Sequence, residues 1–196
     1  MCYYTRFYKM KFLKFFLRSI DKDSYWHLRR LERFAIFMKL LKKEIAQPLR
    51  IIDIGGTPRF WDNMGIANDN RFIIHCFNIK RPAINYKNIL CFLGDATDLK
   101  DIRDKEYDVA FSNSVIEHVY TFENQKKMAN EIKRVAKRYF LQTPNFWFPV
   151  EPHFRLPLVH YFPPNIRTLL VLLSKGRRIT DFKRIKMCSG WHKATH

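Results

Sequence analysis

The most constraining feature of the sequence is a short apolar run that ends in two adjacent glycines. Residues 49–54 read LRIIDI, and Gly55 and Gly56 follow directly. A run of this length that is rich in isoleucine is typical of a strand buried on both faces, and glycines permit the tight turn that follows it. The sequence therefore predicts a buried strand that enters a close turn, a common element of α/β proteins.

Four further apolar runs repeat this signal along the chain. Strands are expected over residues 72–77, 89–93, 107–111 and 138–142. Residues 123–137, between the last two, carry Met128, Ile132 and Val135 on one face with lysines and arginines opposite, which predicts an amphipathic helix. Strands that alternate with helices predict a Rossmann-like, doubly wound, mostly parallel sheet with helices on both faces.

The segments on either side of this core have a different composition. Before it, Asp23 or Ser24 is expected to cap a helix that Pro48 ends. After it, residues 144–165 are rich in aromatic residues and proline, which is typical of an ordered loop or lid. We therefore predict a basic N-terminal helical segment at 1–47, a cofactor-binding core at 48–145, and a lid with a basic C-terminal segment at 146–196.

Positive charge is concentrated in the two flanks. The formal net charge is +18, of which residues 1–50 carry +9, residues 51–154 carry +1 and residues 155–196 carry +8. Basic segments favour anionic partners, either a membrane surface or nucleic acid. Aromatic residues interleave with the cations at the N-terminus, so one expectation is peripheral contact with a membrane, and the alternative is a solvated helical face.

Cysteine spacing and hydropathy indicate the cellular setting. The four cysteines stand far apart without a CxxC pair, so neither a disulfide framework nor a zinc site is predicted. Lysines interrupt the N-terminal apolar residues, unlike in a secretory signal, and the longest later apolar run falls well short of the about 20 residues of a membrane span. We expect a cytoplasmic protein, soluble or peripheral to the membrane.

Polar and small residues follow the predicted strands at the edge where such sheets bind ligands. In open α/β sheets the ligand lies beyond the carboxyl ends of the strands. After the later strands this rule selects Asn78, Asp95, Ala96, Ser112, Asn113 and Ser114. The glycine turn lets the backbone approach a ligand closely, so the sequence predicts a pocket of the nucleotide-binding kind.

Four segments resemble, in order and spacing, the motifs of class I S-adenosylmethionine-dependent methyltransferases. They are LRIIDIGGTPRFW, ILCFLGDATDL, YDVAFSNSVIEHV and RYFLQTPNFWFPVEPHF, and the resemblance is closest to bacterial type 11 or type 23 members over about residues 28–165. Four ordered motifs are far more specific than one glycine pair. The resemblance implies a Rossmann-like fold, S-adenosylmethionine as the cofactor, and methyl transfer as the reaction.

The resemblance also implies positions around the methionine part of the cofactor. Asp53, Gly55 and Gly56 match the residues beside it, and Asp53 would contact its amino group through water. Asn113 and Ser114 match the residues that flank the methionine and the reactive methyl group.

The remaining cofactor positions follow the second and third strands. Asp95 and Ala96 match the pair that meets the adenine, with the carboxylate accepting from the exocyclic amine. Asn78 stands where the family usually has an acid that binds both ribose hydroxyls, and an amide can bond one of them, which predicts weaker binding. Pro58 removes one amide donor from the glycine loop.

Candidates for contact with the acceptor lie after the fourth and fifth strands. By location, His118, Glu117 and His153 are candidate catalytic residues, and Trp147, Glu151 and His153 are candidate substrate contacts. The alternatives are that Glu117 and His118 simply begin a helix, and that the aromatic segment packs between lid and core. Ser114 stands where related O-methyltransferases bind a metal, so no metal is expected.

Three functions remain open. The first is methyl transfer to a small-molecule, lipid-linked or glycan acceptor. The second is methylation of RNA, with the basic flanks contacting phosphates. The third is a non-catalytic remnant that acts as a binding module. It is suggested by the C-terminal SGWHKATH, which shows no strand alternation. The antiparallel strands that usually complete the sheet are therefore expected to be missing, and the chain to be truncated.

Overall fold

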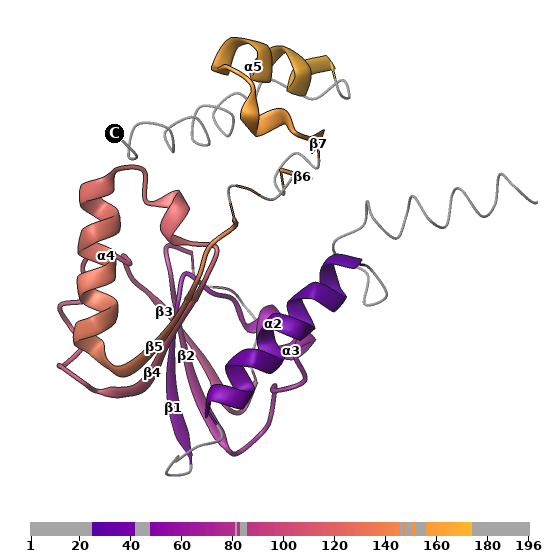
Figure 1. Cartoon of the computed structure of the whole chain (residues 1–196). Coiled ribbons are helices and arrows are strands. Elements are labelled where there is room, and N and C mark those ends of the chain that lie inside the picture. The colour runs from indigo at the N-terminus through magenta and orange to yellow at the C-terminus, as the bar shows by residue number, and fades with distance from the viewer. Residues whose placement is uncertain are drawn as a thin grey trace, which may run out of the picture.

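Five parallel strands form a twisted sheet at the centre of the structure (Figure 1). The computed structural model describes residues 25–41, 48–80, 82, 86–145, 147, 150–151 and 156–173. The strands are β1 (Leu49–Ile54), β2 (Phe72–Asn78), β3 (Ile89–Leu93), β4 (Tyr107–Asn113) and β5 (Ala136–Gln142). Their order is β3-β2-β1-β4-β5, so the chain switches direction across the sheet between β1 and β4. The predicted Rossmann-like fold is confirmed.

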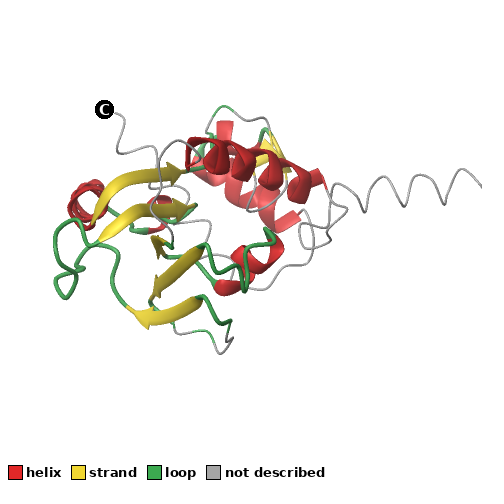
Figure 2. Ribbon diagram, turned by 90° about the horizontal axis from the view of Figure 1, so that it is seen from below, coloured by secondary structure: helices red, strands yellow, loops and turns green. Residues whose placement is uncertain are grey.

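Helices cover both faces of this sheet, as Figures 1 and 2 show from two directions. On one face lie α2 (Tyr25–Leu41) and α3 (Pro58–Asn63), and on the other lies α4 (Phe122–Val135). Successive residues of a strand point to opposite faces. Accordingly, Ile51 packs in the core beside α2 and α3, whereas Ile52 packs in the core beneath α4.

The boundary between α4 and β5 differs from the prediction. The helix ends at Val135 and β5 begins at Ala136 without a loop, although the helical pattern had suggested a helix to residue 137. Val135 and Ala136 are both buried, so the chain reverses directly into the sheet. Lys137 then lies beside β4, where its Nζ donates to Asp108 Oδ1 at 2.8 Å.

The chain after β5 contains more regular structure than its composition predicted. Its elements are β6 (Val150–Glu151), β7 (Leu156–Pro157), the short 3-10 turn η2 (Val159–Tyr161) and α5 (Pro164–Leu173). Pro164 is compatible with α5 because it occupies the first turn, where no helical N–H bond is required. In Figure 1 this segment lies beyond the carboxyl ends of the main strands.

Two predictions about the chain termini fall mainly outside the described residues. Within the described part, β6 and β7 form a separate antiparallel pair and no antiparallel strand joins the main sheet. The predicted caps Asp23 and Ser24 and the basic N-terminal residues also lie outside it. None of the described helices combines the length and apolarity required to cross a bilayer.

Candidate functional site

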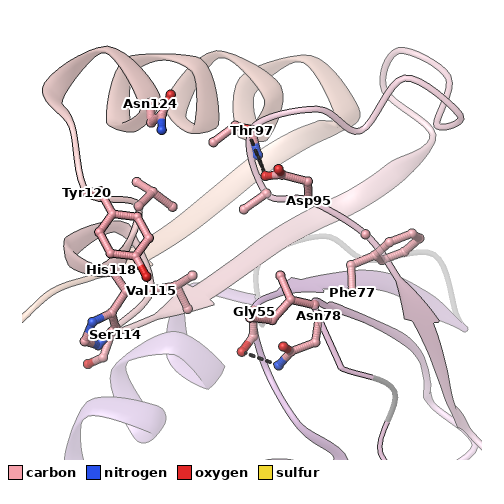
Figure 3. A pocket seen from close by; sticks show the side chains of 14 residues that line it. Gly55, Phe77, Asn78, Asp95, Thr97, Ser114, Val115, His118, Tyr120 and Asn124 are labelled. Atoms are coloured by element: carbon pink, nitrogen blue, oxygen red, sulfur yellow. Dashed lines mark hydrogen bonds between the residues drawn. The ribbon is translucent and has the colours of Figure 1, made fainter. Parts of the chain in front are cut away.

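A cavity of about 370 Å³ lies at the carboxyl ends of the first four strands (Figure 3). This volume is within the range of about 300–1,000 Å³ that is typical of small-molecule sites. Of the predicted site residues, those that line the cavity are Gly55, Asn78, Asp95, Ala96, Ser114 and His118. The sheet therefore brings together residues that are up to 63 positions apart in the sequence, as the strand-end rule predicts.

Gly55 makes the tight turn after β1. Its φ of +80° lies in the left-handed region, and its N–H donates to Phe77 O at 2.7 Å. A Cβ atom here would lie 2.5 Å from the methyl carbons of Val115, which line the cavity across from the turn. Only glycine therefore allows the backbone and Val115 to approach this closely.

Asn78 holds the glycine turn in place. Its side-chain nitrogen donates to Gly55 O at 3.0 Å and to Gly56 O at 3.1 Å. A carboxylate at this position could donate neither bond. Its amide oxygen accepts from Lys80 N at 3.4 Å, and this oxygen has the capacity to accept a second bond from a hydroxyl.

Asp95 forms a tight turn and presents one oxygen to the cavity. Its Oδ1 accepts from the backbone N and from the side-chain hydroxyl of Thr97, both at 2.8 Å, as drawn in Figure 3. These bonds hold the pKa of Asp95 below its usual value, so the exposed carboxylate is charged. Its Oδ2 has no hydrogen-bond partner among the described residues and remains free to accept from a ligand.

The two polar residues at the end of β4, Asn113 and Ser114, face two different hollows. Ser114 has a φ of +57°, and its N–H donates to Gln142 O at 2.8 Å. Ser114 lines the cavity, whereas Asn113 faces a separate recess beside α2. The Ser114 hydroxyl donates to Asn113 Oδ1 at 3.3 Å, so one hydrogen bond joins the two hollows.

Asp53, which lies beneath the glycine turn, and Gly56, the second residue of the turn, do not line the cavity. Asp53 is 1% exposed, its Oδ2 accepts from Trp61 Nε1 at 2.7 Å, and Cys76 Sγ lies 3.9 Å from the same oxygen. Burial raises the pKa of Asp53 to about 7, which the bonds from Trp61 and Cys76 partly oppose. A Cβ on Gly56 would overlap the Asp53 carboxylate, so the two residues pack directly on each other.

The predicted acceptor contacts are only partly brought to the site. His118, in the 3-10 turn η1 (Ile116–His118), reaches the cavity, while Glu117 accepts from Thr143 Oγ1 at 3.3 Å and does not line it. Trp147 is 76% exposed and its ring lies 6.2 Å from that of Tyr161. Glu151 belongs to β6, and His153 lies outside the described residues. The described residues contain no group of acids, histidines and cysteines placed to hold a metal ion.

Several lining residues were not anticipated from the sequence. The cavity also contains Phe77, Thr97, Val115, Val119, Tyr120 and Asn124. Thr97 could have been predicted, because it stands two residues after Asp95, the spacing at which an aspartate side chain bonds to a backbone N–H in a turn. The position of Tyr120 could not have been predicted, because it depends on a φ of +63°, which a residue pattern does not indicate at a non-glycine residue.

Comparison with known proteins relates this arrangement to a methyltransferase domain. Residues 72–139 match the family model "Methyltransferase domain". Two uncharacterized proteins of Mycobacterium tuberculosis, from strains CDC 1551 and H37Rv, are each 36% identical over 56 residues, which is 29% of this chain and 19% of theirs. The chain thus matches about a fifth of the length of these curated relatives.

The chain also matches solved structures of methyltransferases at low sequence identity. A protein of Anabaena variabilis described as a methyltransferase from an antibiotic biosynthesis pathway has 17% identity and a TM-score of 0.48, with 74% of this chain and 62% of that chain covered. A SAM-dependent methyltransferase from Aquifex aeolicus has 18% identity and a TM-score of 0.41, with 72% and 79% covered. The family match confirms the resemblance to class I methyltransferases, whose cofactor is S-adenosylmethionine.

Proposed function

We propose that the protein binds S-adenosylmethionine in the cavity of Figure 3 and transfers the methyl group to a small-molecule, lipid-linked or glycan acceptor. The observation that carries the proposal is the meeting of Gly55, Asn78, Asp95 and Ser114 around one cavity. Each lies at or just after the carboxyl end of a different strand, and each occupies a position at which the motifs resemble class I methyltransferases.

The lining suits this cofactor in shape and in charge. Phe77, Ala96, Val115 and Val119 offer apolar surfaces for a flat base, and the free oxygen of Asp95 can accept from an exocyclic amine. None of the lining residues is a lysine or arginine, so the single acid gives the cavity a negative character. That character favours a ligand that carries a sulfonium and an ammonium group.

The protein's part in the reaction is to orient the acceptor and to exclude water. The cofactor, when bound, supplies an electrophilic methyl group, so alignment contributes more than acid–base chemistry. His118 and Tyr120 lie on one side of the cavity with Ser114 below them (Figure 3). For a hydroxyl acceptor, the imidazole of His118 would take the proton as the oxygen attacks.

Calorimetric titration with S-adenosylmethionine tests the binding part of the proposal. We expect wild-type binding, and about tenfold or greater weakening in Asp95→Ala, because the adenine amine loses a charged acceptor. Asp101→Ala is the matched control, since it removes an exposed acid of the same connection that does not line the cavity. Absence of binding by the wild type would overturn the proposal and favour a non-catalytic remnant.

Transfer of a labelled methyl group tests the acceptor class. The protein and methyl-labelled S-adenosylmethionine are incubated with separate metabolite, lipid and RNA fractions of a cell extract. We expect label in the metabolite or lipid fraction, dependent on Asp95. Label confined to RNA would overturn the proposed acceptor class and favour the alternative based on the basic flanks, whose RNA binding would weaken steeply with salt.

A further inference from the structure

The most exposed apolar side chains of the described residues gather at one end of the molecule. The five large apolar side chains with the highest exposed fractions, from 65% to 79%, are Ile79, Leu93, Tyr120, Phe122 and Trp147. Each lies at or after the carboxyl end of a main strand, from β2 to β5. Ile79 and Tyr120 line the cofactor cavity, and the other three belong to the same end of the sheet. We call these five residues the apolar rim.

The segment after β5, which lies beyond the carboxyl ends of the strands, extends the apolar rim (Figure 1). The ring of Trp147 lies 6.2 Å from that of Tyr161, in η2. Tyr161 is exposed, and so are Ile166 and Leu169 on α5. Ile166 and Leu169 stand three positions apart, so they share one face of the helix. Exposed apolar side chains therefore continue from the strand ends onto α5.

Apolar side chains gathered in this way mark an interaction site. Single exposed apolar residues are common on proteins, whereas a large group of them usually meets a partner. Tyr120, Trp147 and Tyr161 contribute rings with a polar tip, which prefer the interface between the hydrocarbon and the headgroups of a bilayer. The composition of the apolar rim therefore fits a membrane surface.

The charge of the adjoining sequence fits an anionic bilayer. Residues 152–180 contain no acid, and residues 155–196 carry a net charge of +8. Lys80 is exposed beside the rim, and the acids Asp95 and Glu123 are exposed at the same end, so most of the positive charge comes from the C-terminal flank. Basic residues beside exposed apolar side chains are the combination by which peripheral proteins bind anionic lipid surfaces.

We propose that the apolar rim and α5 dock the protein on an anionic lipid bilayer, with the opening of the cofactor cavity toward the headgroups. The apolar side chains enter the interface, and the basic flank contacts the lipid phosphates. Docking itself does not depend on methyl transfer. Its consequence, that the acceptor is a lipid-linked molecule reached from the membrane surface, rests on the proposed function.

Co-sedimentation with vesicles tests the docking. The full chain is mixed with vesicles of phosphatidylcholine alone, or of phosphatidylcholine with about one third phosphatidylglycerol. We expect binding to be about tenfold or more tighter to the anionic vesicles, and to weaken with added salt. The double variant Phe122→Gln/Leu169→Gln should bind the anionic vesicles about tenfold or more weakly, because two exposed side chains no longer enter the apolar part of the interface.

Two exposed apolar residues on α2 provide the matched control. Ile36 and Leu40 are 56% and 61% exposed and lie on a helix that does not belong to the rim. The variant Ile36→Gln/Leu40→Gln should therefore bind the anionic vesicles as the wild type does. Vesicles with brominated acyl chains give a second readout, because they should quench tryptophan emission, and Trp147→Phe should remove a large part of that quenching.

Unchanged vesicle binding in Phe122→Gln/Leu169→Gln would overturn the inference and assign membrane contact to the basic N-terminal segment. Absence of vesicle binding by the wild type would also overturn it, and a dimer in gel filtration that this variant separates would assign the apolar rim to a second copy of the chain. Phe122 and Leu169 do not line the cofactor cavity, so the variant should bind S-adenosylmethionine as the wild type does. Failure of the wild type to bind the cofactor would overturn the proposed function and leave the vesicle result standing.

Discussion

The ends of β1 and β3 each carry an aspartate, and the two carboxylates have opposite surroundings. Asp53 is 1% exposed and rests against Trp61 and Gly56, and burial raises its pKa to about 7. Asp95 is exposed, accepts two hydrogen bonds from Thr97 and has a lowered pKa. One carboxylate supports the glycine turn from below, while the other presents an oxygen to the cavity.

The difference shows that position at a strand end does not by itself make a residue a ligand contact. Asp53 points into the face covered by α3, where the indole of Trp61 reaches it. Asp95 follows β3, the edge strand of the sheet, and its side chain is exposed. Solvent access and the available donors therefore decide which carboxylate is open to a ligand and which one supports the fold.

Substitution of Gly56 should have the largest effect on this arrangement. Gly56→Ala places a methyl group in the space of the Asp53 carboxylate, so either the turn or the buried acid must move. We expect a loss of more than about 4 kcal/mol in the free energy of unfolding, or failure to fold, measured by urea denaturation. Gly94→Ala is the comparison, since its Cβ meets only the ring edge of Phe77, at 2.9 Å, and should cost less. Equal losses would show that Asp53 does not fix the turn.

The pH dependence of stability tests the burial of Asp53. Because its folded pKa is about 7 and its ordinary value is 3.8, the folded state binds more protons between these values, and stability falls as pH rises from about 4 to about 7. At about 1.4 kcal/mol for each pKa unit, the fall amounts to about 4 kcal/mol. Asp53→Asn should remove this slope in urea unfolding between pH 4 and 8. Asp95→Asn should leave this slope unchanged, since a carboxyl with a lowered pKa makes stability depend on pH only below about pH 4. Persistence of the slope in Asp53→Asn would assign it to another group.

Much of the fold could be predicted because its signals are local. Apolar runs predicted all five strands of the main sheet, and the 3.6-residue period predicted α4. Motif resemblance selected Gly55, Asn78, Asp95, Ala96 and Ser114, which all line the cavity. These residues lie at or just after the carboxyl ends of strands, and parallel strands bring those ends to one edge.

The burial of Asp53 could not be predicted, because it depends on how α3 turns back over β1. Trp61 is eight residues away, and nothing in that spacing shows that its indole reaches the carboxylate. That Asn113 and Ser114 face different hollows could not be predicted either, because it depends on a left-handed φ at Ser114. Such features arise from tertiary packing and backbone conformation, which residue patterns do not encode.

Replacement of Asn78 sharpens the comparison by adding a third carboxylate at this edge. Asn78→Asp loses both bonds to the Gly55 and Gly56 carbonyls and places a charge beside two carbonyl oxygens. We expect about 2 kcal/mol less stability and weaker binding of S-adenosylmethionine, measured by urea unfolding and calorimetry. Asn78→Ala, which loses the bonds without adding the charge, should cost about 1 kcal/mol. If the aspartate variant binds the cofactor more tightly, contact with the ribose outweighs support of the turn.

Removal of the indole donor should have the smallest effect, and its pH dependence separates hydrogen bonding from packing. Trp61→Phe takes away the bond that favours the charged form of Asp53, so the pKa of Asp53 should rise further. The variant should therefore lose about 1 to 2 kcal/mol more stability at pH 8, where Asp53 is ionised, than at pH 5, where it is protonated. Trp147→Phe, at a 76% exposed position, is the control and should change stability at neither pH. An equal loss at both pH values would mean that Trp61 contributes only aromatic packing, and that the carboxylate at the end of β1 depends on burial rather than on its donor.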